Sequence, residues 1–233
     1  MKVSTDAVFL ITGAAGGIAG EIIREFREAG ARLALADLPG DRLHARARES
    51  GAIAVESDLT RSDDAERAVR ETISRYARID GVIHTTGGFG MVPAPQIDAE
   101  SYERMFDLNV RTLVLVARAA VPVFVERGSG FLAAFSAAPG FLRGGGAGMS
   151  LYAASKAAVA AFVHALSDEL RDRGVRTAVV YPMDVVDTPA NREAMPDADR
   201  SKWIDPAEIG RALLLAATRG SRARISDIPV YPG

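Results

Sequence analysis

The chain has 233 residues, no cysteine and a net charge of −2 from 28 basic and 30 acidic residues. The missing cysteines exclude disulfides and thiolate metal sites, the three separated histidines lack metal-ligand spacing, and the scattered basic residues argue against a nucleic-acid partner. The N-terminus lacks a signal pattern, and the most apolar run, 112–125, is too short to span a bilayer, so we expect one cytoplasmic domain over 1–233 with no membrane or metal partner.

A glycine-rich turn follows the first predicted strand. Residues 7–11 are a short apolar run typical of a buried parallel strand, and 21–29 has the pattern of an amphipathic helix. The turn between them contains Gly13, Ala15, Gly17 and Ile18. Small residues there let the backbone approach a pyrophosphate at the helix N-terminus, so we expect a dinucleotide site. A tight turn without a ligand is the alternative.

The second predicted strand, 32–36, stops at Asp37, which is followed by Leu38. An acidic residue about 20 positions beyond such a glycine turn accepts hydrogen bonds from the ribose hydroxyls and repels a 2′-phosphate. We therefore expect NAD(H) to be favoured over NADP(H). The alternative is a surface aspartate that begins a turn.

Strands and helices continue to alternate, with helices at 43–50 and 62–76 and strands at 52–55 and 79–83. This alternation predicts parallel strands with right-handed crossovers. Ligands of such sheets bind at the strand ends. The further cofactor candidates follow the third and fourth strands: Asp58, Leu59, Thr86 and Gly87.

Two long helical stretches, 101–126 and 153–170, are apolar on several faces, wider than one core-facing stripe. We expect them to form the interface of a homodimer or homotetramer. Three more strands, 131–135, 175–181 and 227–231, and a helix at 206–218 complete the prediction. The loops 136–151 and 184–204 are expected to form the site for a small-molecule substrate.

Tyr152 and Lys156 lie four residues apart at the start of a predicted helix, so both side chains can reach one small site. A phenol has a pKa of about 10, and a fixed cation nearby lowers that pKa by stabilising the phenolate. Such a pair suits proton transfer to or from a carbinol oxygen. The alternative is a packed tyrosine ring with a solvated lysine one turn further on.

Over its whole length the chain resembles the short-chain dehydrogenases/reductases. The matching motifs occur in the family's order: Thr12-Gly13-x3-Gly17-Ile18, Asp37, Asp58-Leu59, Thr86-Gly87, Asn109-Val110, Tyr152-x3-Lys156 and Pro182…Thr188. The resemblance implies a doubly wound α/β fold, a single-domain Rossmann fold with a seven-stranded parallel sheet and helices on both faces. It also implies a nicotinamide cofactor and a catalytic set of Asn, Ser, Tyr and Lys. It makes Tyr152 the general acid/base, Lys156 the group that binds the nicotinamide ribose, and Asn109 the holder of a relay water. Val186 and Thr188 become cofactor contacts.

The chain departs from the family pattern at three places. Ala19 stands at the third glycine, and His84-Thr85-Thr86-Gly87 replaces Asn-Asn-Ala-Gly. The position of the catalytic serine, 13 residues before the tyrosine in the family, holds Pro139, and Ser136 lies one residue early when counted from Gly140. Either Ser136 serves, or no serine polarises the substrate carbonyl.

Residues 186–203 are similar to the segment after strand six in dihydropteridine reductases, which bind NADH, use Tyr and Lys, and lack the serine. Two functions follow. The first is an NAD(P)(H)-dependent oxidoreductase acting on a carbonyl, an alcohol or a quinonoid pterin-like compound. The second is a cofactor-binding protein without redox turnover, a sensor or scaffold on the same fold. The intact Tyr152 and Lys156 favour the enzyme.

Overall fold

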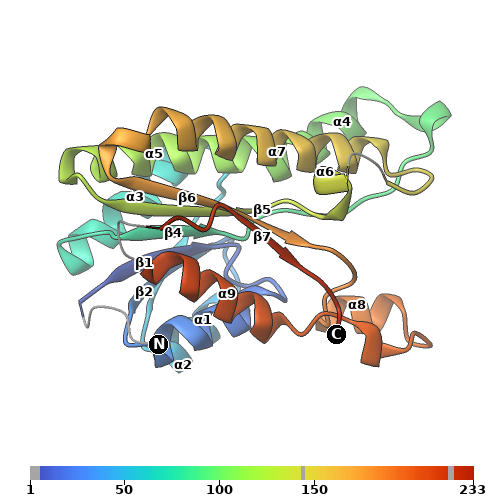
Figure 1. The fold of residues 1–233 in the computed structure, drawn as a ribbon. Coiled ribbons are helices and arrows are strands. Elements are labelled where there is room, and N and C mark those ends of the chain that lie inside the picture. Colours follow the sequence, from blue (N-terminus) through green and yellow to red (C-terminus); the bar gives the residue numbers. More distant parts are fainter. Residues whose placement is uncertain (1–5, 143–144, 220–222) are drawn as a thin grey trace.

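Seven parallel strands form one sheet in the computed structural model, which describes residues 6–142, 145–219 and 223–233 (Figure 1). The strand order is β3-β2-β1-β4-β5-β6-β7. The strands are β1 (Val8–Thr12), β2 (Arg32–Asp37), β3 (Ile53–Glu56), β4 (Gly81–His84), β5 (Gly130–Phe135), β6 (Val175–Pro182) and β7 (Asp227–Val230). The predicted doubly wound α/β fold is confirmed.

Helices cover both faces of the sheet (Figure 1). One face carries α1 (Ala19–Glu28), α2 (Asp41–Ser50) and α9 (Pro206–Thr218), and the other carries α3 (Ser62–Tyr76), α5 (Thr112–Arg127) and α7 (Ser150–Glu169). Within β1, Phe9 and Ile11 point into the first core and Leu10 into the second. Burial on both faces explains why the strands are continuous apolar runs rather than alternating patterns.

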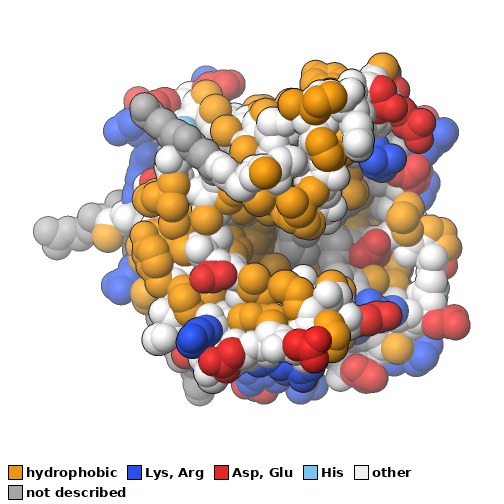
Figure 2. Space-filling view, turned by 90° about the vertical axis from the view of Figure 1, so that its right-hand side faces the viewer, with side chains coloured by type: hydrophobic (Ala, Val, Ile, Leu, Met, Phe, Trp, Pro, Cys, Tyr) orange, Lys and Arg blue, Asp and Glu red, His pale blue; other side chains and the backbone are white. Residues whose placement is uncertain are grey.

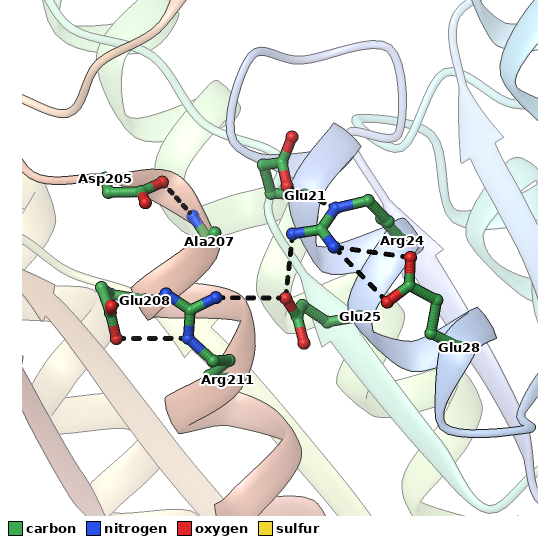
Figure 3. A network of polar contacts seen from close by, with 8 residues as sticks. All are labelled: Glu21, Arg24, Glu25, Glu28, Asp205, Ala207, Glu208 and Arg211. Atoms are coloured by element: carbon green, nitrogen blue, oxygen red, sulfur yellow. Dashed lines mark hydrogen bonds and ion pairs between the residues drawn. The ribbon is translucent and has the colours of Figure 1, made fainter.

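An ion-pair network joins α1 to α9 (Figure 3). Arg211 on α9 contacts Glu25 on α1 at 3.4 Å, and Arg24 contacts the same carboxylate at 2.9 Å. A Cβ at Gly210 would lie 2.9 Å from the Glu25 side chain, so glycine lets the two helices approach closely. The network fixes the last helix against the helix that follows the glycine turn.

Two short helices were not expected from the sequence: α6 (Ala138–Leu142) and α8 (Pro189–Ala194). Helix α6 contains Pro139 and Gly140, which have the lowest helix propensities. Helix α8 is capped by Thr188, whose hydroxyl accepts from the Asn191 backbone N–H at 3.3 Å. Both are too short for hydrophobic periodicity to reveal.

Helix α7 begins at Ser150, so Tyr152 lies inside its first turn.

The predicted helix 101–126 is interrupted. It consists of α4 (Ala99–Phe106), a π-helical turn (Asp107–Arg111) and α5. The described chain also has short 3-10 turns at Ala94–Gln96, Arg171–Arg173 and Arg200–Lys202.

The continuous stretch Ala99–Arg127 has 29 residues, and its most apolar window has a mean hydropathy of 1.7. Among the described helices, it alone is long and apolar enough to cross a membrane by those two measures. The prediction that the apolar run 112–125 is too short to span a bilayer therefore does not hold for the longer helical stretch that contains it. Buried residues of α5, including Val116, Ala120 and Phe124, pack in the core between the sheet and α3.

Candidate active site

A cavity of about 980 Å³ opens at the carboxyl ends of the central strands. The strand order reverses between β1 and β4, which is where open α/β sheets bind ligands. Figure 2 shows the hollow on this face, with hydrophobic side chains gathered around it. Of the predicted site residues, eight line it: Gly17, Ile18, Gly87, Ser136, Tyr152, Lys156, Val186 and Thr188.

The glycine turn is closely packed against two other loops. Gly13 has a φ of +64°, and a Cβ there would lie 2.6 Å from the backbone nitrogen of Thr86. A Cβ at Gly17 would lie 2.7 Å from the Thr188 side chain. Ala19, at the third glycine position, is fully buried in the first turn of α1 and is accommodated. The turn thus forms a cradle of glycine and other small residues, which fits the pyrophosphate of a dinucleotide.

Two arginines of α2 hold the outside of this turn. Arg46 donates hydrogen bonds to the backbone carbonyls of Gly16, at 2.5 Å, and Ala14, and Arg42 donates to that of Ala15 at 3.3 Å. Burial, with a contribution from the like charge of Arg42, lowers the pKa of Arg46. Sequence reasoning missed this role, although the two arginines are spaced i,i+4.

The carboxylate of Asp37 lies beside the glycine turn. It accepts hydrogen bonds from the backbone N–H of Ala15 and of Leu38, both at 2.7 Å. Asp58 uses one carboxylate oxygen to accept from the Thr60 backbone and hydroxyl, and Leu59 is buried. Asp37 ends β2, and Asp58 and Leu59 follow β3; all three lie outside the described lining of the cavity.

Tyr152 and Lys156 face the cavity from α7. The Lys156 ammonium lies 5.9 Å from the centroid of the Tyr152 ring, and the Phe89 ring packs edge-on against that ring at 4.9 Å. The ammonium donates to the Phe135 carbonyl at 3.1 Å, and a Cβ at Gly87 would lie 3.1 Å from it. The pair therefore lies next to the predicted cofactor turn after β4.

Burial shifts the pKa of each partner against its charged form. It raises the pKa of Tyr152 to about 12 and lowers that of Lys156 to about 8. We expected the lysine to lower the tyrosine pKa; in the described chain, desolvation of the phenolate decides instead. At neutral pH the tyrosine is protonated and can donate a proton, while the lysine keeps its charge.

Asn109 is buried within the π-helical turn. Its side-chain oxygen accepts from the Gly88 N–H at 2.8 Å, and its amide nitrogen donates to the Gly88 carbonyl at 3.1 Å and to the Ser155 hydroxyl at 3.0 Å. The side chain thus fixes the turn after β4. Its role in holding a relay water stays a prediction.

Ser136 is buried after β5, and its hydroxyl donates to the Lys156 backbone carbonyl at 2.8 Å. A Cβ at Gly140 would lie 2.3 Å from the Ser136 hydroxyl oxygen, so the glycine packs directly over that hydroxyl. Because the Ser136 hydroxyl donates its proton to a backbone carbonyl of α7, the structure favours the alternative in which no serine polarises the substrate carbonyl.

His84 occupies the position of the first asparagine in the family motif. Its side chain is buried and belongs to a series of hydrogen-bonded polar side chains. Its Nδ1 is 2.8 Å from the Thr12 hydroxyl and its Nε2 is 3.2 Å from the Thr112 hydroxyl. Thr112 itself donates to the Leu108 carbonyl, so it accepts from Nε2–H, and Thr12 donates to Nδ1. Burial, and to a smaller extent the charge of Lys156, lowers the pKa of His84 to about 3. From the sequence alone, His84 was recognised only as a departure from the family motif.

Thr86 donates from its hydroxyl to Thr12 at 3.1 Å, which joins the cofactor turn to this chain. On the opposite wall, Val186 pairs with Ile204, and Thr188 lies against Gly17. The residues present therefore fit a dinucleotide that extends from the glycine cradle toward Tyr152.

A doubly wound sheet whose glycine turn joins the first strand to a helix is the arrangement that binds dinucleotides. The family model described as short chain dehydrogenase matches residues 7–199, and the chain belongs to this family. An uncharacterized oxidoreductase of Staphylococcus aureus (strain MRSA252) is 28% identical over 235 residues, covering 100% of both chains. The 1-deoxy-11-beta-hydroxypentalenate dehydrogenase of Streptomyces exfoliatus is 38% identical over 188 residues, 77% of this chain and 67% of its own length.

Solved structures agree in fold. Levodione reductase superposes with a TM-score of 0.89 at 22% identity, covering 98% of this chain and 97% of its own. A metagenomic short-chain oxidoreductase in complex with NADP gives 0.84 at 24% identity, covering 99% of each. The protein is thus an oxidoreductase that binds a nicotinamide cofactor, and the interpretation as a sensor or scaffold without redox turnover is set aside.

Proposed function

We propose that this oxidoreductase transfers a hydride between a nicotinamide cofactor and a carbonyl compound or its alcohol, with Tyr152 as acid/base. The observation that carries the proposal is that the Tyr152 side chain and the glycine cradle face the same cavity. Among the described residues the Tyr152 hydroxyl makes no hydrogen bond, and burial raises its pKa to about 12, so the hydroxyl keeps its proton at neutral pH.

A nicotinamide held by the glycine cradle would supply or accept the hydride. In the reducing direction Tyr152 gives its proton to the substrate oxygen, and in the oxidising direction it takes one. Lys156, charged below a pKa of about 8, stabilises the tyrosinate left behind. Asn109 and Gly87 hold the neighbouring turn so that the lysine and the cofactor ribose can meet.

We further infer a preference for NAD(H). The Asp37 carboxylate lies at the glycine turn, where it can accept from ribose hydroxyls and repel a 2′-phosphate. Arg42 and Arg46 lie on the same side, but their guanidinium groups are engaged with the backbone carbonyls of the turn. The acidic group is therefore the better candidate for contact with the ribose.

Replacement of the tyrosine hydroxyl tests the proposal. Tyr152→Phe should lower kcat by about 10²–10⁴ and leave the Kd for NADH nearly unchanged, because the hydroxyl carries the proton but few cofactor contacts. NADH absorbance reports turnover and fluorescence titration reports binding. Tyr102→Phe, at a half-exposed tyrosine outside the cavity, is the matched control. If Tyr152→Phe keeps more than a third of the activity, the assignment fails.

A quinonoid pterin-like substrate, as in dihydropteridine reductases, is the second candidate. The engagement of the Ser136 hydroxyl with Lys156 favours it, because such a substrate is already activated by its ring and needs no serine. It would still take its proton from Tyr152.

The apolar character of α5 and α7 supports a homodimer or homotetramer. Apolar side chains there, including Leu115, Val123, Phe162 and Leu166, are only partly buried. A second copy that packs against these helices would cover them and would account for the high hydropathy of Ala99–Arg127. Sedimentation of a 24.7 kDa species at micromolar concentration would exclude this assembly.

A further inference from the structure

Methionines gather around the cavity. The chain has six methionines, and four of them line it: Met91, Met149, Met183 and Met195. They come from four different segments, after β4, before α7, after β6 and at the end of α8. Methionine is unbranched and polarizable, and it adapts to irregular apolar partners.

The methionines are part of a larger apolar wall. Phe89 is 63% exposed, Met91 58% and Leu142 64%, and all three lie at the mouth of the same cavity. Exposed large hydrophobics clustered at a concave site mark a binding surface for apolar groups. Figure 2 shows hydrophobic side chains, coloured orange, around the hollow on this side of the molecule.

Most polar side chains of the described lining make at least one hydrogen bond within the chain. The side chains of Thr85, Ser136 and Asn191 donate to the backbone carbonyls of Thr12, Lys156 and Val186, respectively.

Two of the remaining polar groups accept from the backbone: Thr188 from Asn191, and the exposed Asp184 from Val185. Lys156 donates to the Phe135 carbonyl, whereas the Tyr152 hydroxyl makes no hydrogen bond among the described residues and lines the cavity.

From these observations we propose that the substrate is a bulky, uncharged and predominantly apolar ketone, or its secondary alcohol, whose single polar group meets Tyr152. This substrate class rests on the proposed hydride transfer. In the reduction, the carbonyl π bond breaks, the carbon gains the hydride from the reduced nicotinamide, and the oxygen gains the Tyr152 proton. A pterin carries several ring donors and acceptors, which this wall would leave unpaired.

The test compares three ketones with the same reacting ring. These are cyclohexanone, 4-butylcyclohexanone and 4-(3-hydroxypropyl)cyclohexanone, in which a hydroxyl replaces the terminal methyl group. The value of kcat/KM should rise by up to about fourfold for each buried methylene of the butyl chain. The terminal hydroxyl should lower it by about tenfold, because it enters a predominantly apolar wall. Equal rates for the butyl and hydroxypropyl compounds, or faster reduction of a quinonoid dihydropterin, would overturn the inference.

Variants of the wall then test which residues cause the preference for the butyl ketone. Met91→Gln and Met195→Gln introduce amides of similar size into opposite sides of the wall. Each should reduce the kcat/KM ratio of 4-butylcyclohexanone to cyclohexanone by at least about fivefold, as expected for a polar group without a partner. Met91→Leu should keep the ratio. Ile97→Gln, at an exposed apolar residue outside the described lining, should also keep it. An unchanged ratio in both methionine-to-glutamine variants contradicts the proposal.

A binding measurement separates this inference from the proposed function. Calorimetric titration of Tyr152→Phe with NADH present gives the Kd of each ketone without turnover. Tighter binding of the butyl than of the hydroxypropyl compound supports the apolar wall even if the unaltered protein reduces neither ketone, in which case only the hydride transfer is wrong. Equal binding of the two refutes the apolar wall whatever the rates.

Discussion

The cofactor side and the substrate side of the cavity are built in different ways. On the cofactor side, Gly13 and Gly17 bring backbone against neighbouring loops with no room for a Cβ, and the Asp37 carboxylate is bonded to the turn. On the substrate side, the exposed side chains of Phe89 and Met91, on the loop after β4, and of Leu142, at the end of α6, line the cavity. The first side recognises one fixed ligand shape, whereas the second can adapt to its ligand.

The largest expected effect tests the rigidity of the cofactor side. Gly13 and Gly51 have φ angles of +64° and +67°, but a Cβ at Gly51 would meet nothing within 4 Å. Gly51→Ala should therefore cost only the left-handed backbone penalty, about 1–2 kcal/mol.

Gly13→Ala adds a collision with the backbone of Thr86. It should lower the free energy of unfolding by at least about 3 kcal/mol and abolish NADH binding. Urea unfolding and NADH titration of both variants measure the difference. Equal losses in the two variants would mean that the cradle can relax.

This contrast also explains what the sequence could predict. The strand ends and the glycine turn were predictable because buried strands, amphipathic helices and a positive-φ glycine leave short local patterns. The positions of Asp37 and Tyr152 follow from those patterns and from the family resemblance.

The remainder depends on contacts between distant segments. The π-helical turn at Asp107–Arg111 has no periodic signature, and the orientation of the Ser136 hydroxyl is set by Lys156, 20 residues away. The methionine wall arises only when four loops meet. The pKa of Tyr152 depends on burial, which the i,i+4 spacing with Lys156 does not reveal.

The next prediction concerns His84, which joins Thr86 on the cofactor side to the turn that holds Asn109. Its folded-state pKa of about 3 lies below the unfolded value near 6.5, so the unfolded chain binds a proton that the folded chain excludes. Between those values, stability falls as the pH falls, by about 1.4 kcal/mol for each pH unit.

His84→Asn, which restores the family residue, should remove this contribution. The carboxylates and the exposed His44 and His164 are common to both proteins and cancel. Between pH 6.5 and pH 4.5, the wild-type protein should therefore lose about 2–3 kcal/mol more than the variant, as measured by urea unfolding. Parallel stability curves would contradict a buried neutral histidine.

A smaller effect is expected for cofactor choice. Asp37→Ala should weaken NADH binding by the loss of hydrogen bonds to a charged group, about 1.5–3 kcal/mol, and narrow its advantage over NADPH. Arg42→Ala, at the same turn, is the control and should not weaken NADH. Fluorescence titration with both cofactors gives the Kd values. Tighter binding of NADPH than of NADH by the unaltered protein would refute the preference.

The smallest kinetic effect is expected at Ser136. If its hydroxyl donated to the substrate oxygen, Ser136→Ala would cost about 2.7–4 kcal/mol of barrier, the scale for losing one such donor. The hydroxyl instead donates to the Lys156 carbonyl beneath Gly140. We therefore expect kcat/KM to change by less than about threefold, well below the loss of one catalytic donor.

The same substitution should still affect folding. It removes one buried hydrogen bond, a loss of about 1 kcal/mol that lowers the melting temperature by about 2–4 °C in a chain of this size. Measuring both quantities on one variant separates the roles, because a positioning serine lowers the melting temperature and a catalytic serine lowers the rate. A hundredfold loss of kcat/KM with unchanged melting would return Ser136 to the catalytic set and make the substrate side as specific in its polar contacts as the cofactor side.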